Sequence, residues 1–121
     1  MKANELMIDD WVYNKNIDKP MQIYPTIFSQ MFRSNPNATT EDYNIFPIPL
    51  TPEILEKNGF VFLSGLWYLI TKERKPIHIV FKDNNVITLS INATPVPIGL
   101  KYIHQLQHAL RLYGIEKEII L

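Results

Sequence analysis

Four runs of β-branched and aromatic residues between positions 60 and 91 constrain the fold of this chain more than any other feature. They read FVFLS, LWYLIT, IHIVFK and VITLSI, and each has the length of one strand. Ser64-Gly65, residues 72–76 and Asp83-Asn84-Asn85 separate them, and all three segments have turn chemistry. The sequence therefore predicts a four-stranded antiparallel meander.

Apolar and more polar residues alternate along the last two runs, so that one side of the predicted hairpin is apolar and the other is more polar. The apolar side is formed by Ile77, Ile79, Phe81, Ile87, Leu89 and Ile91. The opposite side holds His78, Val80, Lys82, Thr88 and Ser90. An apolar sheet face needs a cover, and the segment that follows can supply it.

Residues 100–114 (LKYIHQLQHALRLYG) have the periodicity of a helix that ends at Gly114. Its apolar stripe comprises Ile103, Leu106, Leu110 and Tyr113, flanked by Tyr102, Ala109 and Leu112. We expect this stripe to cover the hairpin. The helix would then expose a surface marked by His104, Gln107, His108 and Arg111.

The N-terminal part is less regular. Residues 6–13 favour a strand with Ile8, Trp11 and Tyr13 as strand positions, and residues 14–20 favour a turn. Pro25 interrupts residues 21–32, which predicts a returning strand that breaks up or turns into a short helical piece. Residues 33–44 are polar and predict a surface loop, with a binding loop as the alternative.

A short helix is signalled more clearly. Residues 45–50 (IFPIPL) cannot pair fully and should form an extended edge, because two prolines lack donors. Thr51 and Pro52 then form a helix start, and Gly59 followed by Phe60 forms a helix stop. We predict a single α+β domain over residues 1–121, with an N-terminal β-hairpin or small barrel-like unit, this helix, and a β-meander covered by the C-terminal helix.

Composition excludes several classes of function. The 121 residues include 12 basic and 12 acidic side chains, and this zero net charge argues against bulk electrostatic binding of nucleic acid or lipid. Without cysteine the chain has no disulfide, thiolate nucleophile or cysteine zinc site. Acidic residues interrupt the N-terminal segment and no apolar run reaches the length of a membrane span, so we expect a cytoplasmic protein.

One spacing resembles a catalytic motif. His104 and His108 stand at the spacing of the metalloprotease helix motif H-E-x-x-H, in which both histidines reach one zinc ion. Gln105 occupies the position of the required glutamate, however, and an amide cannot take a proton from metal-bound water. The sequence therefore predicts no catalytic residue, no metal site and no cofactor, and it predicts that the protein is not an enzyme.

Two surfaces remain as candidates for binding. One is a basic turn with aromatic neighbours, which could bind single-stranded nucleic acid weakly. Its cations are Lys72, Arg74, Lys75 and Lys82, and its aromatic neighbours are Trp67, Tyr68 and Phe81. A charged turn commonly serves only to keep a hairpin soluble, however.

The tail, residues 116–121, ends in Ile119, Ile120 and Leu121, and we expect it to dock as a short strand on its own sheet or on a partner. The leading interpretation is therefore a non-enzymatic protein-interaction module. We expect its partner to be another protein or a second copy of itself, with a homo-oligomer favoured, and we expect no membrane association.

Three segments together resemble a known group. They are the opening NELMIDDWVY, residues 48–60 (IPLTPEILEKNGF) and residues 101–119 (KYIHQLQHALRLYGIEKEI). They are similar to small proteins of unknown function encoded in Bacteroidetes genomes, often within prophages and mobile elements. Asp9 stands where that group usually has glycine. The resemblance implies the same order of strand, helix, meander and final helix, and an accessory role for a phage or mobile element, but no activity.

Overall fold

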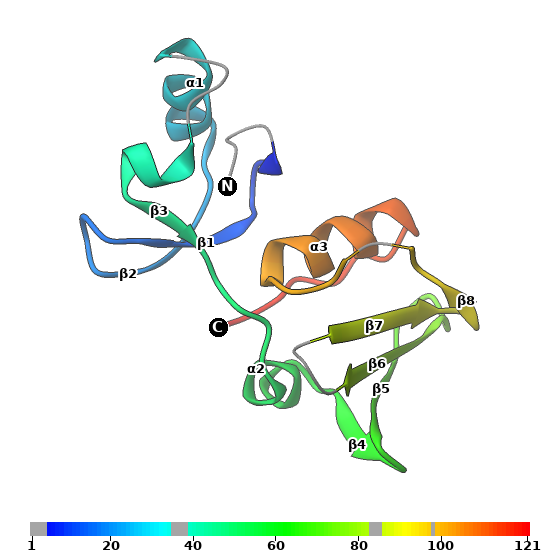
Figure 1. The fold of residues 1–121 in the computed structure, drawn as a ribbon. Helices are drawn as coiled ribbons and strands as arrows, with labels where there is room; N and C mark the ends of the chain where they lie inside the picture. Colours follow the sequence, from blue (N-terminus) through cyan, green and yellow to red (C-terminus); the bar gives the residue numbers. More distant parts are fainter. Residues whose placement is uncertain (1–4, 35–38, 83–85, 98) are drawn as a thin grey trace. The chain divides into compact units, whose positions relative to one another are not determined.

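The computed structural model describes residues 5–34, 39–82, 86–97 and 99–121. The chain divides into two compact units, Met1–Ile48 and Pro49–Leu121 (Figure 1). Antiparallel sheets with helices make this an α+β protein, as the sequence predicts. The assignment of the whole chain to one domain stays a prediction.

The first unit contains a three-stranded sheet in the order β2-β1-β3. The strands are β1 (Trp11–Asn14), β2 (Lys19–Gln22) and β3 (Ile45–Pro47), and both neighbours of β1 are antiparallel to it. Val12 and Asn14 are the buried positions of β1, which overlaps only the last three residues of the strand predicted over residues 6–13. Ile8 lies in the preceding turn rather than in the strand.

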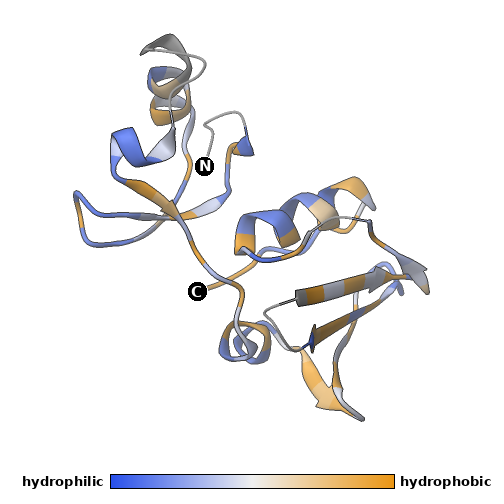
Figure 2. Cartoon of the chain, viewed as in Figure 1, coloured by the Kyte–Doolittle hydropathy of each residue, from blue (hydrophilic) through white to orange (hydrophobic). Residues whose placement is uncertain are grey.

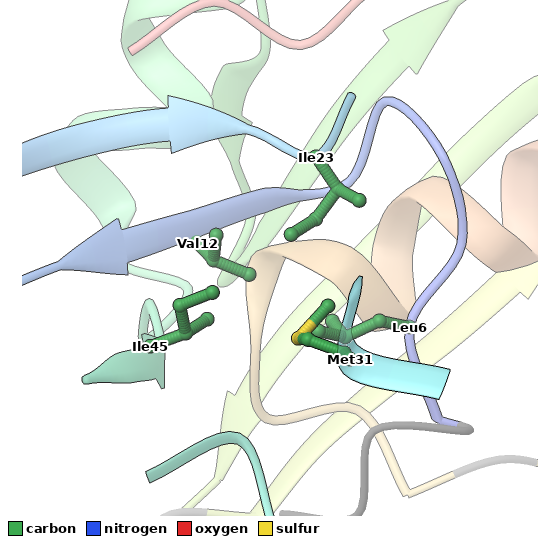
Figure 3. Close-up of a cluster of buried hydrophobic side chains, with 5 residues drawn as sticks. All are labelled: Leu6, Val12, Ile23, Met31 and Ile45. Atoms are coloured by element: carbon green, nitrogen blue, oxygen red, sulfur yellow. The ribbon is translucent and has the colours of Figure 1, made fainter. Parts of the chain in front are cut away.

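The core of this unit gathers side chains from separate elements, as Figure 3 shows. Its buried members are Leu6, Val12, Ile23, Met31 and Ile45. Met31 comes from helix α1 (Pro25–Ser34), which begins at Pro25 because proline fits the first helical turn. The ambiguous segment 21–32 is thus the end of a strand followed by a helix.

The polar segment after α1 is partly ordered by its own side chains. Residues 35–38 of the predicted loop lie outside the described part of the chain. A 3₁₀ turn, η2 (Thr40–Tyr43), follows, and the Asp42 carboxylate accepts a hydrogen bond from the Thr39 N–H at 3.1 Å. Asn44 then adopts a left-handed conformation, which asparagine tolerates, and leads directly into β3.

The second unit contains a five-stranded antiparallel sheet in the order β4-β5-β6-β7-β8. The strands are β4 (Val61–Leu63), β5 (Leu66–Ile70), β6 (Pro76–Lys82), β7 (Val86–Ile91) and β8 (Thr94–Pro95). The first four match the predicted runs, while the predicted turn at residues 83–85 lies outside the described residues. The fifth strand is an addition to the predicted meander, because the prolines around it concealed it.

Helix α2 (Pro52–Lys57) has the predicted signals at both ends. The Thr51 hydroxyl accepts a hydrogen bond from the Ile54 N–H at 3.4 Å. After the helix, Gly59 has a φ of +89°, and the Phe60 N–H donates to the Leu55 carbonyl at 3.0 Å. These contacts form the Schellman motif expected of Gly59.

Helix α3 (Ile103–Leu112) is fastened at both ends to the sheet of the second unit. A β-bridge joins Leu100, just before the helix, to Ile87 at the start of β7. At the other end, the Lys75 ammonium donates to the Tyr113 carbonyl at 2.7 Å. The helix therefore runs along the sheet in the direction of β7, and Figure 1 shows it lying beside that strand. This arrangement confirms the predicted cover.

The buried part of α3 differs in detail from the predicted stripe. The helix begins at Ile103 rather than at residue 100, and Ile103, Leu106, Ala109 and Leu110 are buried. Leu112, predicted to flank the stripe, is 78% exposed. Within the described parts of the chain, no helix is long and apolar enough to cross a membrane.

Candidate functional site

The edges of the two sheets are protected unequally. Among the strands that the structure describes, the edge strands β2, β3 and β8 contain Pro20, Pro47 and Pro95. Proline removes a backbone donor and so prevents another strand from pairing fully at that edge. Strand β4, the remaining edge, contains neither proline nor a charged residue. It is the one described edge without such protection.

All three residues of β4 are apolar and exposed. The exposed fractions are 53% for Val61, 56% for Phe62 and 56% for Leu63. Because successive side chains of a strand point to opposite faces, both faces of the sheet are open at this edge. Figure 2 shows β4 as a continuous hydrophobic arrow at the border of its sheet.

The apolar surface continues from β4 onto the outer face of the sheet, the face opposite the buried Ile77 and Ile79. Register places Val61 beside Tyr68, which in turn lies beside His78, with its ring centroid 5.1 Å from the imidazole. The apolar residues of this outer face are Val61, Leu63, Leu66, Tyr68, Ile70 and Val80. We call β4 and this set of residues the hairpin surface.

The backbone of Phe62 is directed toward the open side. Ser64 and Gly65, with φ values of +52° and +84°, form a two-residue turn of the type that joins Leu63 and Leu66 as a hydrogen-bonded pair. Pairs alternate along an antiparallel ladder, so Phe62 and Trp67 form a non-hydrogen-bonded pair. Their ring centroids are 5.3 Å apart, as expected for the closer side chains of such a pair. The N–H and C=O of Phe62 therefore point away from β5.

The basic turn predicted as a nucleic-acid contact has a structural use. The Lys75 ammonium is bound to the end of α3, and the Glu73 carboxylate accepts a hydrogen bond from the Glu116 N–H at 3.2 Å. Backbone N–H groups of Glu73 and Glu116 hold the pKa of the Glu73 carboxyl below its usual value. Lys72 and Arg74 remain exposed. The turn thus fastens the sheet to the loop that follows α3.

The aromatic residues expected beside this turn do not form one platform. Register places Trp67 and Phe81 on the inner face, in line with Ile79, whereas Tyr68 and Lys82 belong to the outer face. A base-stacking surface needs its rings and cations on one side. The predicted basic and aromatic cluster is therefore divided between two faces.

Replacing Lys75 with Met is expected to lower the free energy of unfolding by about 1 kcal/mol, because the hydrogen bond from its ammonium to the Tyr113 carbonyl at the end of α3 is lost. Lys72→Met is the matched control, since Lys72 is an exposed lysine of the same turn, and it should change stability by less than about 0.5 kcal/mol. Urea denaturation of both variants measures the difference. Equal losses would show that the contact with Tyr113 contributes nothing.

The structure corrects the predicted exposure of His104 on α3. His104 is buried and His108 is half-buried, and their rings are edge to face with centroids 5.6 Å apart. Tyr102 stacks on His104 with centroids 5.8 Å apart. His78 belongs to the outer face of the sheet, so the three histidines are not brought together. In the described parts of the chain, no group of three histidines or acidic residues is placed to hold a metal.

Gln105 has a role that explains why an amide occupies this position. Its side-chain oxygen accepts hydrogen bonds from the Lys101 N–H at 2.7 Å and from the Tyr102 N–H at 2.9 Å. It therefore caps the start of α3, as a residue at the third helical position often does. A Ser or Thr at the N-cap would have indicated in the sequence that Gln105 caps the helix, but here the N-cap is Tyr102.

The remaining predicted residues of α3 divide in the same way. Gln107 is buried, which corrects its expected exposure, whereas Arg111 is exposed as predicted. The buried arc of α3 is wider than its apolar stripe because it includes the polar residues His104 and Gln107. Apolar periodicity alone could not reveal polar positions that are also buried.

The C-terminal tail docks, but not as the predicted strand. Asn58, at the end of α2, donates to the Ile120 carbonyl at 2.8 Å and accepts from the Ile120 N–H at 2.7 Å. Ile119 is buried, Ile120 is 59% exposed and Leu121 is half-buried. An asparagine side chain thus replaces the neighbouring strand that we expected, and Ile119 is part of the core rather than an exposed contact.

Comparisons with known proteins give no further guide to this surface. No protein family model, no curated protein and no solved structure matches the chain.

Proposed function

We propose that the chain is a non-enzymatic protein-interaction module that binds its partner by strand addition at β4. The observation that carries this proposal is the contrast between β4, which is apolar and unprotected, and the three proline-containing edges. In strand addition an extended segment pairs with an exposed sheet edge, and its backbone supplies the hydrogen bonds. We further propose a cytoplasmic accessory protein of a phage or mobile element, as the sequence resemblance implies.

Affinity and selectivity would come from different parts of the hairpin surface. The outward N–H and C=O of Phe62 would pair with any extended backbone. Selectivity would come from side chains on both faces. Phe62 on the inner face and Val61, Leu63 and Ile70 on the outer face are each more than half exposed. Scattered exposed hydrophobic residues are ordinary on a protein surface, but a contiguous set at an open edge is typical of an interaction site.

The alternative of weak single-stranded nucleic-acid binding has less support. Of its proposed cations, Lys75 is bound to the Tyr113 carbonyl, and its aromatic residues lie on opposite faces of the sheet. Lys72 and Arg74 alone resemble the charged turn that keeps many hairpins in solution.

Random extended peptides displayed on phage and selected on the immobilised chain are expected to yield binders rich in β-branched and aromatic residues. Affinities of the selected peptides would then be measured with the original chain and with two variants. Val61→Lys places a charge in the edge and should weaken binding by at least about tenfold.

Leu112→Lys is the matched control, because Leu112 is an exposed leucine of α3 outside the hairpin surface. It should leave peptide affinity unchanged. The proposal fails if no peptide is selected, or if selected peptides bind the Val61→Lys variant as well as they bind the original chain.

A further inference from the structure

We infer that the strand added at β4 is β4 of a second copy of this chain, paired antiparallel so that Phe62 of one copy lies opposite Phe62 of the other. This inference rests on the proposed function and names its partner. Pairing of this kind has two-fold symmetry, because the same strand is contributed by both copies. The two five-stranded sheets would join into one continuous sheet.

The backbone is suited to a pair centred on Phe62. Its N–H and C=O point toward the open side, since Phe62 and Trp67 form a non-hydrogen-bonded pair within the hairpin. A residue whose backbone is directed outward in this way forms a hydrogen-bonded pair with the opposite residue of the added strand. Phe62 of each copy would therefore donate to and accept from Phe62 of the other.

The side chains on the inner face would form an aromatic row. Residues directly opposite in an antiparallel pair share a face, so the two Phe62 rings would lie side by side. Each ring already contacts Trp67 of its own copy, with centroids 5.3 Å apart. The row would run from one Trp67 across both Phe62 rings to the second Trp67, and aromatic pairs add to what burial alone contributes.

The side chains on the outer face would also be matched. With Phe62 at the centre, Val61 of each copy lies opposite Leu63 of the other, so that an apolar residue meets another apolar residue at both positions. No charged residue occurs between Lys57 and Lys72, which means that the two hairpins bring no like charges together. A different partner would have to match this charge-free surface, whereas a second copy matches it by symmetry.

The size of the hairpin surface fits a weak dimer. Val61, Phe62, Leu63 and Ile70 are 53% to 58% exposed. With their half-buried neighbours they present on the order of 500 Å² of apolar surface, which is the size of a functional patch rather than of scattered side chains. Pairing edge to edge would bury only the part of each patch at β4, which is less than the ~1,000 Å² of a stable interface, so the dimer should be weak and concentration-dependent.

Disulfide formation between introduced cysteines can test both the pairing and its register, because the chain has no cysteine of its own. The Phe62→Cys variant should form a disulfide-linked dimer under oxidised glutathione. Its two thiols would lie on opposed residues about 5.5 Å apart at Cα, within the range of disulfides. The Leu112→Cys variant, with its cysteine at an exposed position of α3, measures the rate of random collisions.

The register is tested by two further single-cysteine variants. Val61→Cys and Leu63→Cys should each cross-link poorly alone, because identical positions would be diagonal neighbours about 7–8 Å apart, beyond the separation that a disulfide spans. An equal mixture of the two variants should cross-link rapidly into the mixed dimer, which mass spectrometry identifies. Sedimentation velocity of the unaltered chain should show dimer that increases with concentration.

Two results would overturn the inference. One is a Phe62→Cys variant that cross-links no faster than Leu112→Cys, together with a mixture of Val61→Cys and Leu63→Cys that gives no mixed dimer. The other is rapid cross-linking of Val61→Cys with itself, which requires a different register. If selected peptides still bind at β4 in either case, the proposed function holds and only its assignment to a second copy is wrong. If peptides also fail to bind, both are wrong.

Discussion

Replacing Leu106 with Ala is expected to lower the free energy of unfolding by about 3 kcal/mol, because a fully buried leucine is removed and a cavity remains. Leu106 is 0% exposed on the helix that covers the second sheet. The loss should appear as a lower midpoint of urea denaturation with an unchanged slope. Circular dichroism at the wavelength of helix absorption follows the transition.

Leu112→Ala is the matched control for this prediction. It makes the same change in the same helix, but at a side chain that is 78% exposed, so its effect should stay within about 0.5 kcal/mol. If the two substitutions cost the same, α3 does not bury the face that contains Leu106. The difference between two leucines six positions apart therefore tests the orientation of the helix.

Replacing Asn58 with Ala is expected to lower the free energy of unfolding by about 2 kcal/mol, because three partly buried hydrogen bonds to the backbone of Ile54 and Ile120 are lost. Asn58 is 5% exposed, and its amide serves the Ile54 carbonyl at 2.8 Å as well as both backbone groups of Ile120. The tail should then be released. The substitution should increase the rate of amide hydrogen exchange at Ile120 by a larger factor than the rate at Leu106, which reports on the helix.

A chain that ends after Ile119 separates the two roles of Asn58. It keeps the buried Ile119 but lacks the Ile120 groups that Asn58 binds. Asn58→Ala should cost less in this shortened chain, and the difference is the coupling energy between Asn58 and the tail. An equal cost in both backgrounds would contradict a contribution from these hydrogen bonds. A cut after Glu118 would not isolate this contact, because it also removes Ile119 from the core.

Much of the fold could be predicted because its signals are local. The Thr51-Pro52 start and the Gly59 stop of α2 each depend on residues within one turn of the helix. The alternation of residues in β6 is also a local signal, and it correctly predicts that Ile77 and Ile79 lie on the buried face of the sheet. Such features follow from neighbouring residues and need no knowledge of distant contacts.

Other features depend on contacts that the sequence does not indicate. The tail meets Asn58 across 62 positions, and nothing in residues 116–121 distinguishes an asparagine side chain from a strand as its partner. Likewise, the burial of His104 and Gln107 depends on the whole environment of α3 and not on its own periodicity.

The candidate site was missed for a related reason. The sequence indicates that residues 61–63 form a strand, but it does not indicate whether this strand lies at the edge or in the middle of the sheet. Only the order β4-β5-β6-β7-β8 makes the apolar character of Val61, Phe62 and Leu63 unusual. In a central strand, the same three residues would be an ordinary part of a hydrophobic core.

The proline in β8 has a consequence for how far assembly can proceed. A sheet with two open edges can recruit copies at both sides and grow into a fibre without a natural end. Here Pro95 lies at the edge opposite β4, so a sheet joined at β4 presents a proline-containing border on each side. Growth should therefore stop at two copies, and the chain can keep one unprotected edge strand without forming amyloid-like polymers.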